Sequence, residues 1–309
     1  MMLLLYIISY IQAIRFESWF GWVFSFSYGC VLWPLRSPPL DRAVSFLAAF
    51  FLATASIFLI NQYFDREIDQ ENEVKKELPL ASGRVTSEGT ILFSALLVAL
   101  CLIIVFAVDR SLLYLFLIYL GLLVAYSAPP FRLKTKPIVD LLVAGIGSGL
   151  LPFLIGIEVS HQLSDNLSFP WVRKRYFDAF LTVIPLILFN SSLHIIQAVG
   201  DYDSDRKAGL NTFVVRYGRE RSVFVAGLMS LASILSLAFY FSLSLIPIDY
   251  LMIIFLLFPL LLPIAFRYIR VLREPSMESV FRLTRITIKY GPPILFFIWI
   301  FGYFLKRFS

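Results

Sequence analysis

Charged residues are scarce in this sequence of 309 residues. Asp, Glu, Lys and Arg make up 16% of the chain, whereas soluble domains carry about a quarter. Hydrophobic residues make up 59%, and the mean hydropathy is +0.80. Apolar runs of about twenty residues, long enough to cross a bilayer as helices, recur along the whole chain. The composition therefore excludes an ordinary soluble enzyme and predicts an all-α integral membrane protein.

Cysteine and histidine are also rare, with two of each. Cys30 and Cys101 lie in apolar runs, so we expect buried small side chains rather than a disulfide. A zinc or haem site would have few ligands to draw on. The net charge of +6 could suggest nucleic acid, but the basic residues are spread over the loops between apolar runs, which is typical of membrane topology. We predict no nucleic-acid partner.

The apolar runs predict nine membrane spans, most of them bounded by Pro, Gly or charged clusters. The connections between them are too short for a soluble domain, so we expect residues 1–309 to form a single polytopic membrane domain. The spans fall near residues 10–34, 43–68, 90–108, 111–127, 138–157, 177–203, 221–245, 247–270 and 286–306.

Lys and Arg are distributed unequally between the two sets of loops. Of the 27, the loops after spans 2, 4, 6 and 8 and the adjoining helix ends hold 17, and the opposite side holds 8. The excess of basic residues marks the cytoplasmic side. We therefore predict a multi-pass protein of the cell membrane with its N-terminus and even-numbered loops in the cytoplasm.

An acidic motif, NQYFDREID, ends the second apolar span at residues 61–69. Asn61, Asp65 and Asp69 are spaced i, i+4 and i+8. Each step of four turns a helix position by only about 40°, so the three side chains share one face. Carboxylates near lipid are costly and usually mark a functional site.

The same arrangement recurs at the end of span 6, where the chain reads HIIQAVGDYDSDRKAGL. Gln197, Asp201 and Asp205 repeat the spacing of one amide followed by two carboxylates. The alternative is a pair of solvated helix ends, but residue type, spacing and depth are all duplicated. We interpret the two motifs as one site.

Four carboxylates and two amides offer hard oxygen ligands. Such ligands favour Mg²⁺, which commonly binds through carboxylates together with substrate phosphates. The spacing alone thus predicts Mg²⁺-bridged binding of a di- or triphosphate at a membrane interface. A phosphate bound in lipid suggests a lipid phosphate.

Four motifs stand in register along the chain: NxxxDxxxD, the DxxxD that runs into DRKAG, the segment YSAPPFRLK from Tyr126 to Lys134, and the segment LPLASGRVT from Leu78 to Thr86. Together they resemble the UbiA-type intramembrane prenyltransferases. The resemblance extends from about Arg15 to Gly218. It implies a bundle of nine transmembrane helices around a central, lipid-accessible cavity, with two pseudo-repeated Asp-rich helix ends on the cytoplasmic side.

The resemblance also implies an activity. A prenyl group would pass from an allylic polyprenyl diphosphate, of geranylgeranyl type, to a hydrophobic or amphipathic acceptor such as a lipid, a quinone precursor or a pigment, with release of diphosphate. The cofactor implied for this activity is Mg²⁺. Asp65, Asp69, Asp201 and Asp205 would hold the metal and carry catalysis, with Asn61 as a further ligand and Gln197 in support.

Basic residues on the same side are candidates to bind the diphosphate. They are Arg132, Lys134 and Lys207, followed by Arg15 and Arg84, and each could instead be a loop charge that sets topology. Aromatic faces stabilise cations, so Tyr126, in the YSAPP motif with Ser127, is a catalytic candidate for stabilising the cation formed on ionisation.

The sequence departs from the family pattern at two places. Gln197 stands where many members carry Asn or Asp. The segment before SGRVT commonly reads NRPLP, whereas this chain has ELPLA, so a basic residue that the family often uses is absent. Lys75 or Lys76 is the candidate to replace it.

Two other functions are compatible with acidic helix ends. A transporter of Mg²⁺ or of a phospholipid-type substrate would need ionisable residues continuing through the mid-membrane, and here they stop at the helix ends. A non-catalytic prenyl-lipid-binding protein would tolerate loss of one motif, and both are intact. We predict contact with membrane lipid and no obligate protein partner.

Overall fold

The computed structural model describes residues 2–32, 38–160, 169–242 and 249–308. Within these ranges the chain is helical and contains no strand. The α-helices are α1 (Met2–Ala13), α2 (Phe20–Ser27), α3 (Leu40–Glu71), α4 (Ser87–Asp109), α5 (Leu113–Ser127), α6 (Pro137–Gly145), α7 (Leu151–Ser160), α8 (Phe169–Lys207), α9 (Phe213–Tyr217), α10 (Arg219–Ser242), α11 (Asp249–Arg273) and α12 (Met277–Phe308).

The helices form two compact units. The first comprises Met1–Trp19, Val44–Val143 and Asp201–Tyr217. It therefore contains α1, α4, α5, α9, most of α3 and α6, and the last turns of α8. The second unit comprises Phe20–Ala43, Ala144–Gly200 and Gly218–Ser309.

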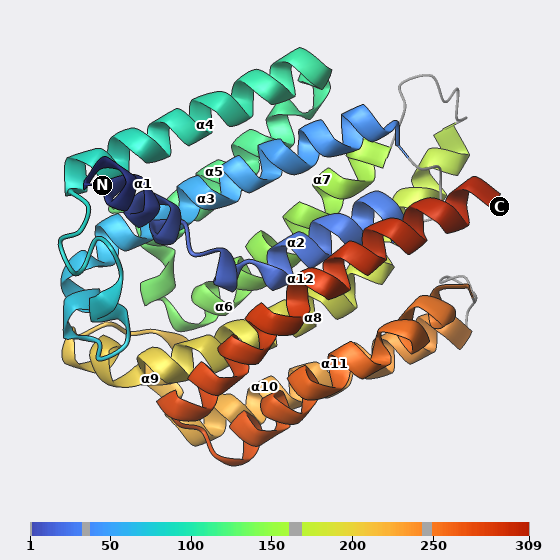
Figure 1. Cartoon of the computed structure of the whole chain (residues 1–309). Coiled ribbons are helices and arrows are strands. Elements are labelled where there is room, and N and C mark those ends of the chain that lie inside the picture. The colour runs from blue at the N-terminus through green and yellow to red at the C-terminus, as the bar shows by residue number, and fades with distance from the viewer. Residues whose placement is uncertain (1, 33–37, 161–168, 243–248, 309) are drawn as a thin grey trace. The chain divides into compact units, whose positions relative to one another are not determined.

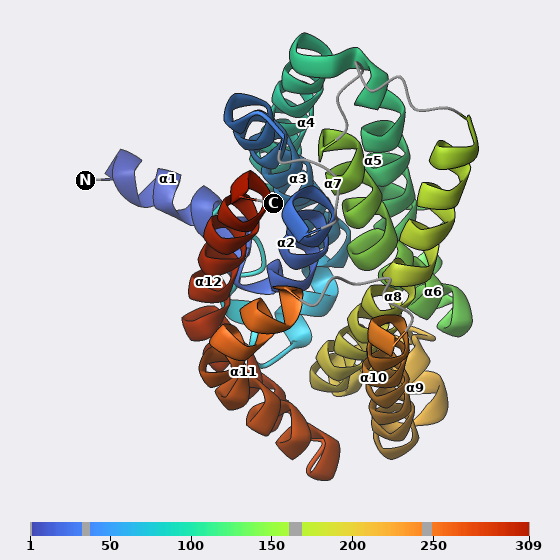
Figure 2. The same ribbon diagram turned by 90° about the vertical axis from the view of Figure 1, so that its right-hand side faces the viewer.

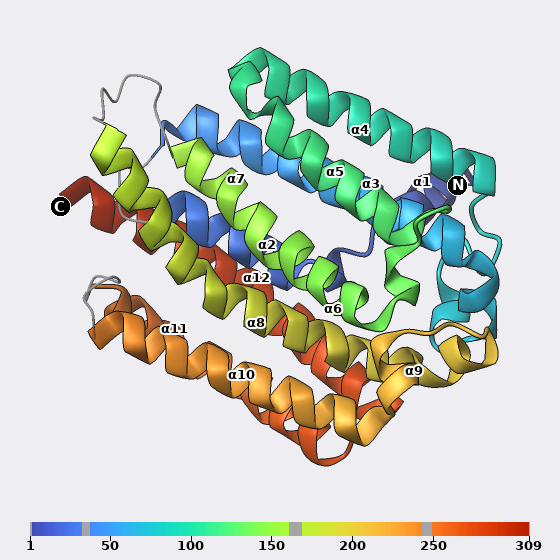
Figure 3. The ribbon, with the colours of Figure 1, turned by 180° about the vertical axis from the view of Figure 1, so that it is seen from behind.

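In the first unit, α3, α4 and α5 run side by side (Figures 1 and 3). Buried hydroxyl groups join them. Thr54 on α3 and Tyr119 on α5 lie 3.0 Å apart between hydroxyl oxygens, and Ser94 on α4 donates to the Ser56 carbonyl at 3.1 Å. Because lipid offers no polar partners, such hydrogen bonds hold membrane helices together. This packing fixes the end of α3 beside the end of α5.

The second unit relies on close helix approach and on hydroxyl groups. Figure 2 shows α2 beside α7. A side chain at Gly29, just after α2, would collide with the Phe153 carbonyl, and one at Gly156 would collide with the Phe26 carbonyl. Both glycines are thus required for this approach. Elsewhere in the unit, the Ser192 hydroxyl on α8 hydrogen-bonds to those of Ser230 and Tyr268.

Five helical stretches of the described residues are long and apolar enough to cross a membrane. They are Leu40–Glu71, Ser87–Ser127, Pro137–Ser160, Phe180–Lys207 and Arg219–Tyr240. Each of the nine predicted spans overlaps a helix, and the all-helical prediction is confirmed. The count of nine membrane spans is not confirmed, because α4 and α5 form one helical stretch and, among the described residues, α11 and α12 are not among these five.

Candidate active site

The first acidic motif lies on the last turns of α3. This helix continues to Glu71 without interruption, so Asn61, Asp65 and Asp69 do lie along one helix as predicted. The Asp65 side chain is 15% exposed and that of Asp69 is 7% exposed. The carboxylates are therefore held away from bulk water, where they interact strongly with neighbouring charges.

Asp65 is surrounded by donors. The Lys134 ammonium group contacts both of its carboxylate oxygens, and the Arg132 Nη2 atom lies 3.4 Å from its Oδ1 atom. Asn61 donates to the Asp65 Oδ2 atom at 3.0 Å and to the Ser127 hydroxyl at 3.1 Å. The structure thus brings together all five of these residues, each of which the sequence had marked as a candidate.

The backbone of the loop after α5 places Arg132 and Lys134 beside Asp65. Arg132 has φ 35° and ψ 57°, in the left-handed region. A non-glycine residue there carries a cost of about 1 kcal/mol. The Arg132 guanidinium also reaches the Phe64 carbonyl at 3.5 Å. The Lys134 side chain is 7% exposed, so its charge is compensated within the protein by Asp65.

The second acidic motif meets the loop between α3 and α4. The Lys75 Nζ atom lies 2.7 Å from the Asp201 Oδ2 atom and 3.9 Å from the Asp69 Oδ1 atom. Asn72 donates to the Asp201 Oδ1 atom at 3.2 Å and to the Ser204 hydroxyl at 2.9 Å. Lys75 therefore joins one carboxylate from each motif.

Asn72 also shapes the loop that carries Lys75. Its side-chain oxygen accepts hydrogen bonds from the backbone N–H groups of Val74 at 3.0 Å and Lys75 at 3.1 Å. An asparagine that bonds two and three residues ahead stabilises a turn. Asn72 is 5% exposed, so this turn is anchored in the protein interior.

Two carboxylates keep Lys75 charged. Burial lowers the pKa of Lys75, but Asp201 and Asp69 raise it more, and the net shift of the pKa is upward. A buried lysine without partners would tend to lose its proton. Lys75 therefore keeps its positive charge between the two acidic helices.

The remaining two predicted catalytic residues lie nearby. Asp205 is within electrostatic reach of Asp65, Asp201 and Lys134, and the Thr212 hydroxyl lies 3.4 Å from its Oδ2 atom. The Tyr126 hydroxyl donates to Asp140 at 2.8 Å. Asp140 also accepts from the Phe213 backbone N–H at 3.4 Å, so it connects α5 and α6 with the start of α9.

Other predicted residues are less closely tied to the carboxylates. Arg84 holds its own loop, donating to the Gln12 side chain at 2.8 Å and to the Glu77 carbonyl at 2.5 Å. Arg15 has a left-handed backbone and acts electrostatically on Asp69. Lys207 is exposed. Gln197 is exposed on α8 and belongs to the second unit, so its part in the site stays a prediction.

The donor atoms at this site suit a hard divalent cation. Four carboxylates from α3 and α8 interact electrostatically, and oxygen donors of this kind are those that Mg²⁺ prefers. Within the described ranges, however, no three His, Cys, Asp or Glu residues are arranged closely enough to hold a metal. Asp65 and Asp201 instead each contact a lysine ammonium group, which satisfies their charge.

Sequence reasoning missed Asn72 and Asp140 and left Lys75 as one of two options. Asn72 follows Asp69 by three residues and so continues the same helical row, which was an available signal. Lys76 is exposed, and the contacts of Lys75 distinguish the two lysines. Asp140 lies in an apolar helix, where a single carboxylate could also have been singled out.

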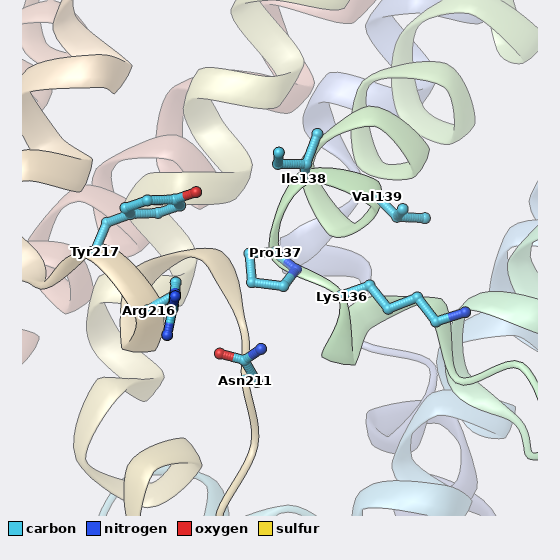
Figure 4. A pocket seen from close by; sticks show the side chains of 7 residues that line it. All are labelled: Lys136, Pro137, Ile138, Val139, Asn211, Arg216 and Tyr217. Atoms are coloured by element: carbon cyan, nitrogen blue, oxygen red, sulfur yellow. The ribbon is translucent and has the colours of Figure 1, made fainter.

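A pocket of about 450 Å³ opens beside the start of α6 (Figure 4). Arg216, Tyr217 and Asn211 line it together with the first turn of α6, and the Lys136 side chain extends to the other side of Pro137. None of the predicted site residues lines this pocket. The predicted central, lipid-accessible cavity stays a prediction.

Comparison with known proteins identifies the family. The model of the UbiA prenyltransferase family matches residues 22–301, so the chain belongs to this family. With its apolar helices, it is a multi-pass membrane protein. A UbiA homolog from Archaeoglobus fulgidus, solved with GPP and Mg²⁺ bound, has the same fold. Its TM-score is 0.67 at 21% identity, with 93% of this chain and 99% of that chain covered.

Two curated relatives have a higher sequence identity to this chain, over part of its length. A 2-acylphloroglucinol 4-prenyltransferase from Humulus lupulus is 30% identical over 60% of this chain and 42% of its own length. A lycopene elongase/hydratase from Haloferax volcanii is 30% identical over 57% of this chain and 54% of its own length. The matched stretches thus span about half the length of these relatives.

Proposed function

We propose that the protein is a Mg²⁺-dependent prenyltransferase that moves a prenyl group from an allylic diphosphate, of geranylgeranyl type, to a hydrophobic acceptor. The observation that carries the proposal is the gathering of Asp65, Asp69, Asp201 and Asp205 in one compact unit, with Lys75 and Lys134 between them. An acidic cluster with fixed cations is suited to a metal–diphosphate pair.

The four aspartates, with Asn61, would hold Mg²⁺. When bound, Mg²⁺ supplies positive charge that compensates the diphosphate as the carbon–oxygen bond breaks. Lys134, Arg132 and Lys75 would bind the diphosphate oxygens from the protein side. Lys207, Arg15 and Arg84 would add to the positive potential that attracts the diphosphate.

Tyr126 would face the allylic cation. Its hydroxyl is engaged by Asp140, which fixes the ring and directs the oxygen away from the role of a nucleophile. An aromatic face stabilises a desolvated cation by about 2 kcal/mol without reacting with it. Ser127, which accepts from Asn61, would hold that amide in place. Gln197, which is exposed, would support the second motif more weakly than Asn72, which donates to Asp201.

The acceptor is the least constrained part of the proposal. The relatives are named for an acylphloroglucinol and for lycopene, and both acceptor types are hydrophobic or amphipathic. We propose a lipid, quinone precursor or pigment for this chain. We further propose that the site faces the cytoplasm, because the basic residues are more numerous in the loops on this side.

The test uses the full-length protein purified in lipid with Mg²⁺ and radiolabelled geranylgeranyl diphosphate. Acceptors offered singly are geranylgeranylglyceryl phosphate, 4-hydroxybenzoate, dihydroxynaphthoate, chlorophyllide and lycopene. We expect a labelled lipid product with one of them, its loss on adding EDTA, and its recovery with Mg²⁺. Full activity in EDTA would contradict the metal assignment, and failure to bind the labelled diphosphate would contradict the proposed reaction class.

A further inference from the structure

Each acidic motif is neutralised by one lysine, and the two lysines come from different loops. Lys134 contacts Asp65, and Lys75 contacts Asp201 at 2.7 Å. Asp65 and Asp201 are the first carboxylates of their respective motifs. The same oxygens are those expected to receive Mg²⁺ under the proposed function, on which this inference rests.

A carboxylate oxygen bound by an ammonium group competes with metal binding. The ammonium group and the metal ion are both cations, and the ion pair of lysine and carboxylate must separate before the oxygen can coordinate a metal. The two lysines differ in how readily they could do so. The Lys134 side chain is 7% exposed, whereas that of Lys75 is 25% exposed. Breaking a buried pair is costly, so Lys75 is the one better placed to move.

The loop around Lys75 is built so that the ammonium group can move while the backbone stays. Asn72 accepts the backbone N–H groups of Val74 and Lys75 and simultaneously donates to Asp201. The turn is thereby fixed to α8 independently of the Lys75 side chain. Release of the ammonium group would leave the Asn72 contacts intact.

We propose that Lys75 is a positioning residue whose ammonium group pairs with the Asp201 carboxylate in the absence of Mg²⁺ and diphosphate, and pairs with the diphosphate when both are bound. The exchange keeps the charge at the site balanced in both states. Without the prenyl diphosphate, Lys75 compensates the charges of Asp201 and Asp69. With it, the carboxylates would hold the metal, and the Lys75 ammonium group would bind the diphosphate. The residue therefore disfavours metal binding alone and favours metal together with diphosphate.

The experiment measures Mn²⁺ binding by electron paramagnetic resonance in the full-length protein in lipid, first without and then with inorganic pyrophosphate. For Lys75→Met we expect Mn²⁺ alone to bind about tenfold more tightly than in the wild type, since no ion pair has to break. With saturating Mn²⁺, we expect pyrophosphate to bind about tenfold more weakly, since one of its cations is missing. Opposite shifts in the two affinities are the signature of the exchange.

Lys76→Met is the matched control, because it removes the same charge from an adjacent, exposed position. It should leave both affinities within twofold, and an equal rise in Mn²⁺ affinity would show a general charge effect and overturn the proposal. Lys75→Arg keeps the charge and should restore both affinities toward the wild type. If Lys75→Met leaves Mn²⁺ affinity unchanged or weakens it, Lys75 does not compete with metal.

Asp201→Asn separates this inference from the proposed function. If the carboxylates bind the metal, Asp201→Asn loses Mn²⁺ binding whatever Lys75 does. Loss of binding in Asp201→Asn with no gain in Lys75→Met would reject only the role of Lys75. Wild-type binding in Asp201→Asn would reject the metal site itself.

Discussion

The two acidic motifs have the same spacing but are completed in different ways. On α3, Asn61 lies one turn before Asp65 and donates to it directly. On α8, the equivalent position is Gln197, which is exposed, and the amide that donates to Asp201 comes from Asn72 in the loop after α3. Asn72 thus does for the second motif what Asn61 does for the first.

This difference shows that a repeat in sequence is not a repeat in contacts. The first motif is completed by its own helix and by the loop after α5. The second is completed by the loop between α3 and α4, which is distant from it in the sequence. Each leading aspartate nevertheless has one amide donor and one lysine. The chemistry is duplicated even where the positions are not.

The largest expected effect is loss of either leading carboxylate. Asp65→Asn and Asp201→Asn should each lower prenyl transfer about 10³-fold, because a neutral amide cannot compensate the charge of the metal. Initial rates with radiolabelled donor measure this. Activity near the wild-type level in one of the two variants would show that the motifs are not equivalent in chemistry.

The same pair should differ in stability. Asp65→Asn leaves Lys134, which is almost fully buried, without its carboxylate, whereas Asp201→Asn leaves Lys75 with Asp69 at 3.9 Å. Uncompensated buried charge is strongly destabilising. Thermal unfolding in detergent should therefore show a lower Tm for Asp65→Asn than for Asp201→Asn, and the reverse order would contradict the contacts described above.

Variants with an intermediate effect on activity test whether Asn72, rather than Gln197, supplies the amide of the second motif. Asn61→Ala and Asn72→Ala should each lower activity about 10- to 100-fold, as loss of a partner that orients a metal ligand commonly does. Gln197→Ala should change activity less than about threefold, because Gln197 is exposed. A large loss of activity in Gln197→Ala with a small loss in Asn72→Ala would show that Gln197, and not Asn72, is the equivalent of Asn61.

A smaller effect than that of either asparagine is expected at Arg84. Its guanidinium donates to the Gln12 side chain and to the Glu77 carbonyl, so it holds the loop that carries Lys75. Arg84→Ala should weaken activity by less than about tenfold, and Arg84→Lys should recover part of the loss through a single donor. Parallel titration of donor and acceptor measures whether the KM for the diphosphate donor changes.

Sequence reasoning reached the helices and the acidic rows because both depend on local periodicity. Asp65 and Asp69 could be placed on one face from their spacing alone, and Arg132 and Lys134 from a resemblance that includes their loop. Lys75 and Asn72 lie in a loop without periodicity, and their contacts depend on where α8 ends. Gln197 is placed by spacing alone, and because its side chain is exposed, its part in the site stays a prediction.

The contacts of Lys75 also have a consequence for how the protein is made. Lys134 and Asp65 are 69 residues apart in the chain, whereas Lys75 and Asp201 are 126 apart. Membrane proteins emerge from the ribosome N-terminal end first. Asp65 can acquire Lys134 once α5 and the loop after it have been synthesised, whereas Lys75 has only Asp69 as a partner until the end of α8 supplies Asp201. The two halves of the acidic site are therefore completed at different stages of synthesis.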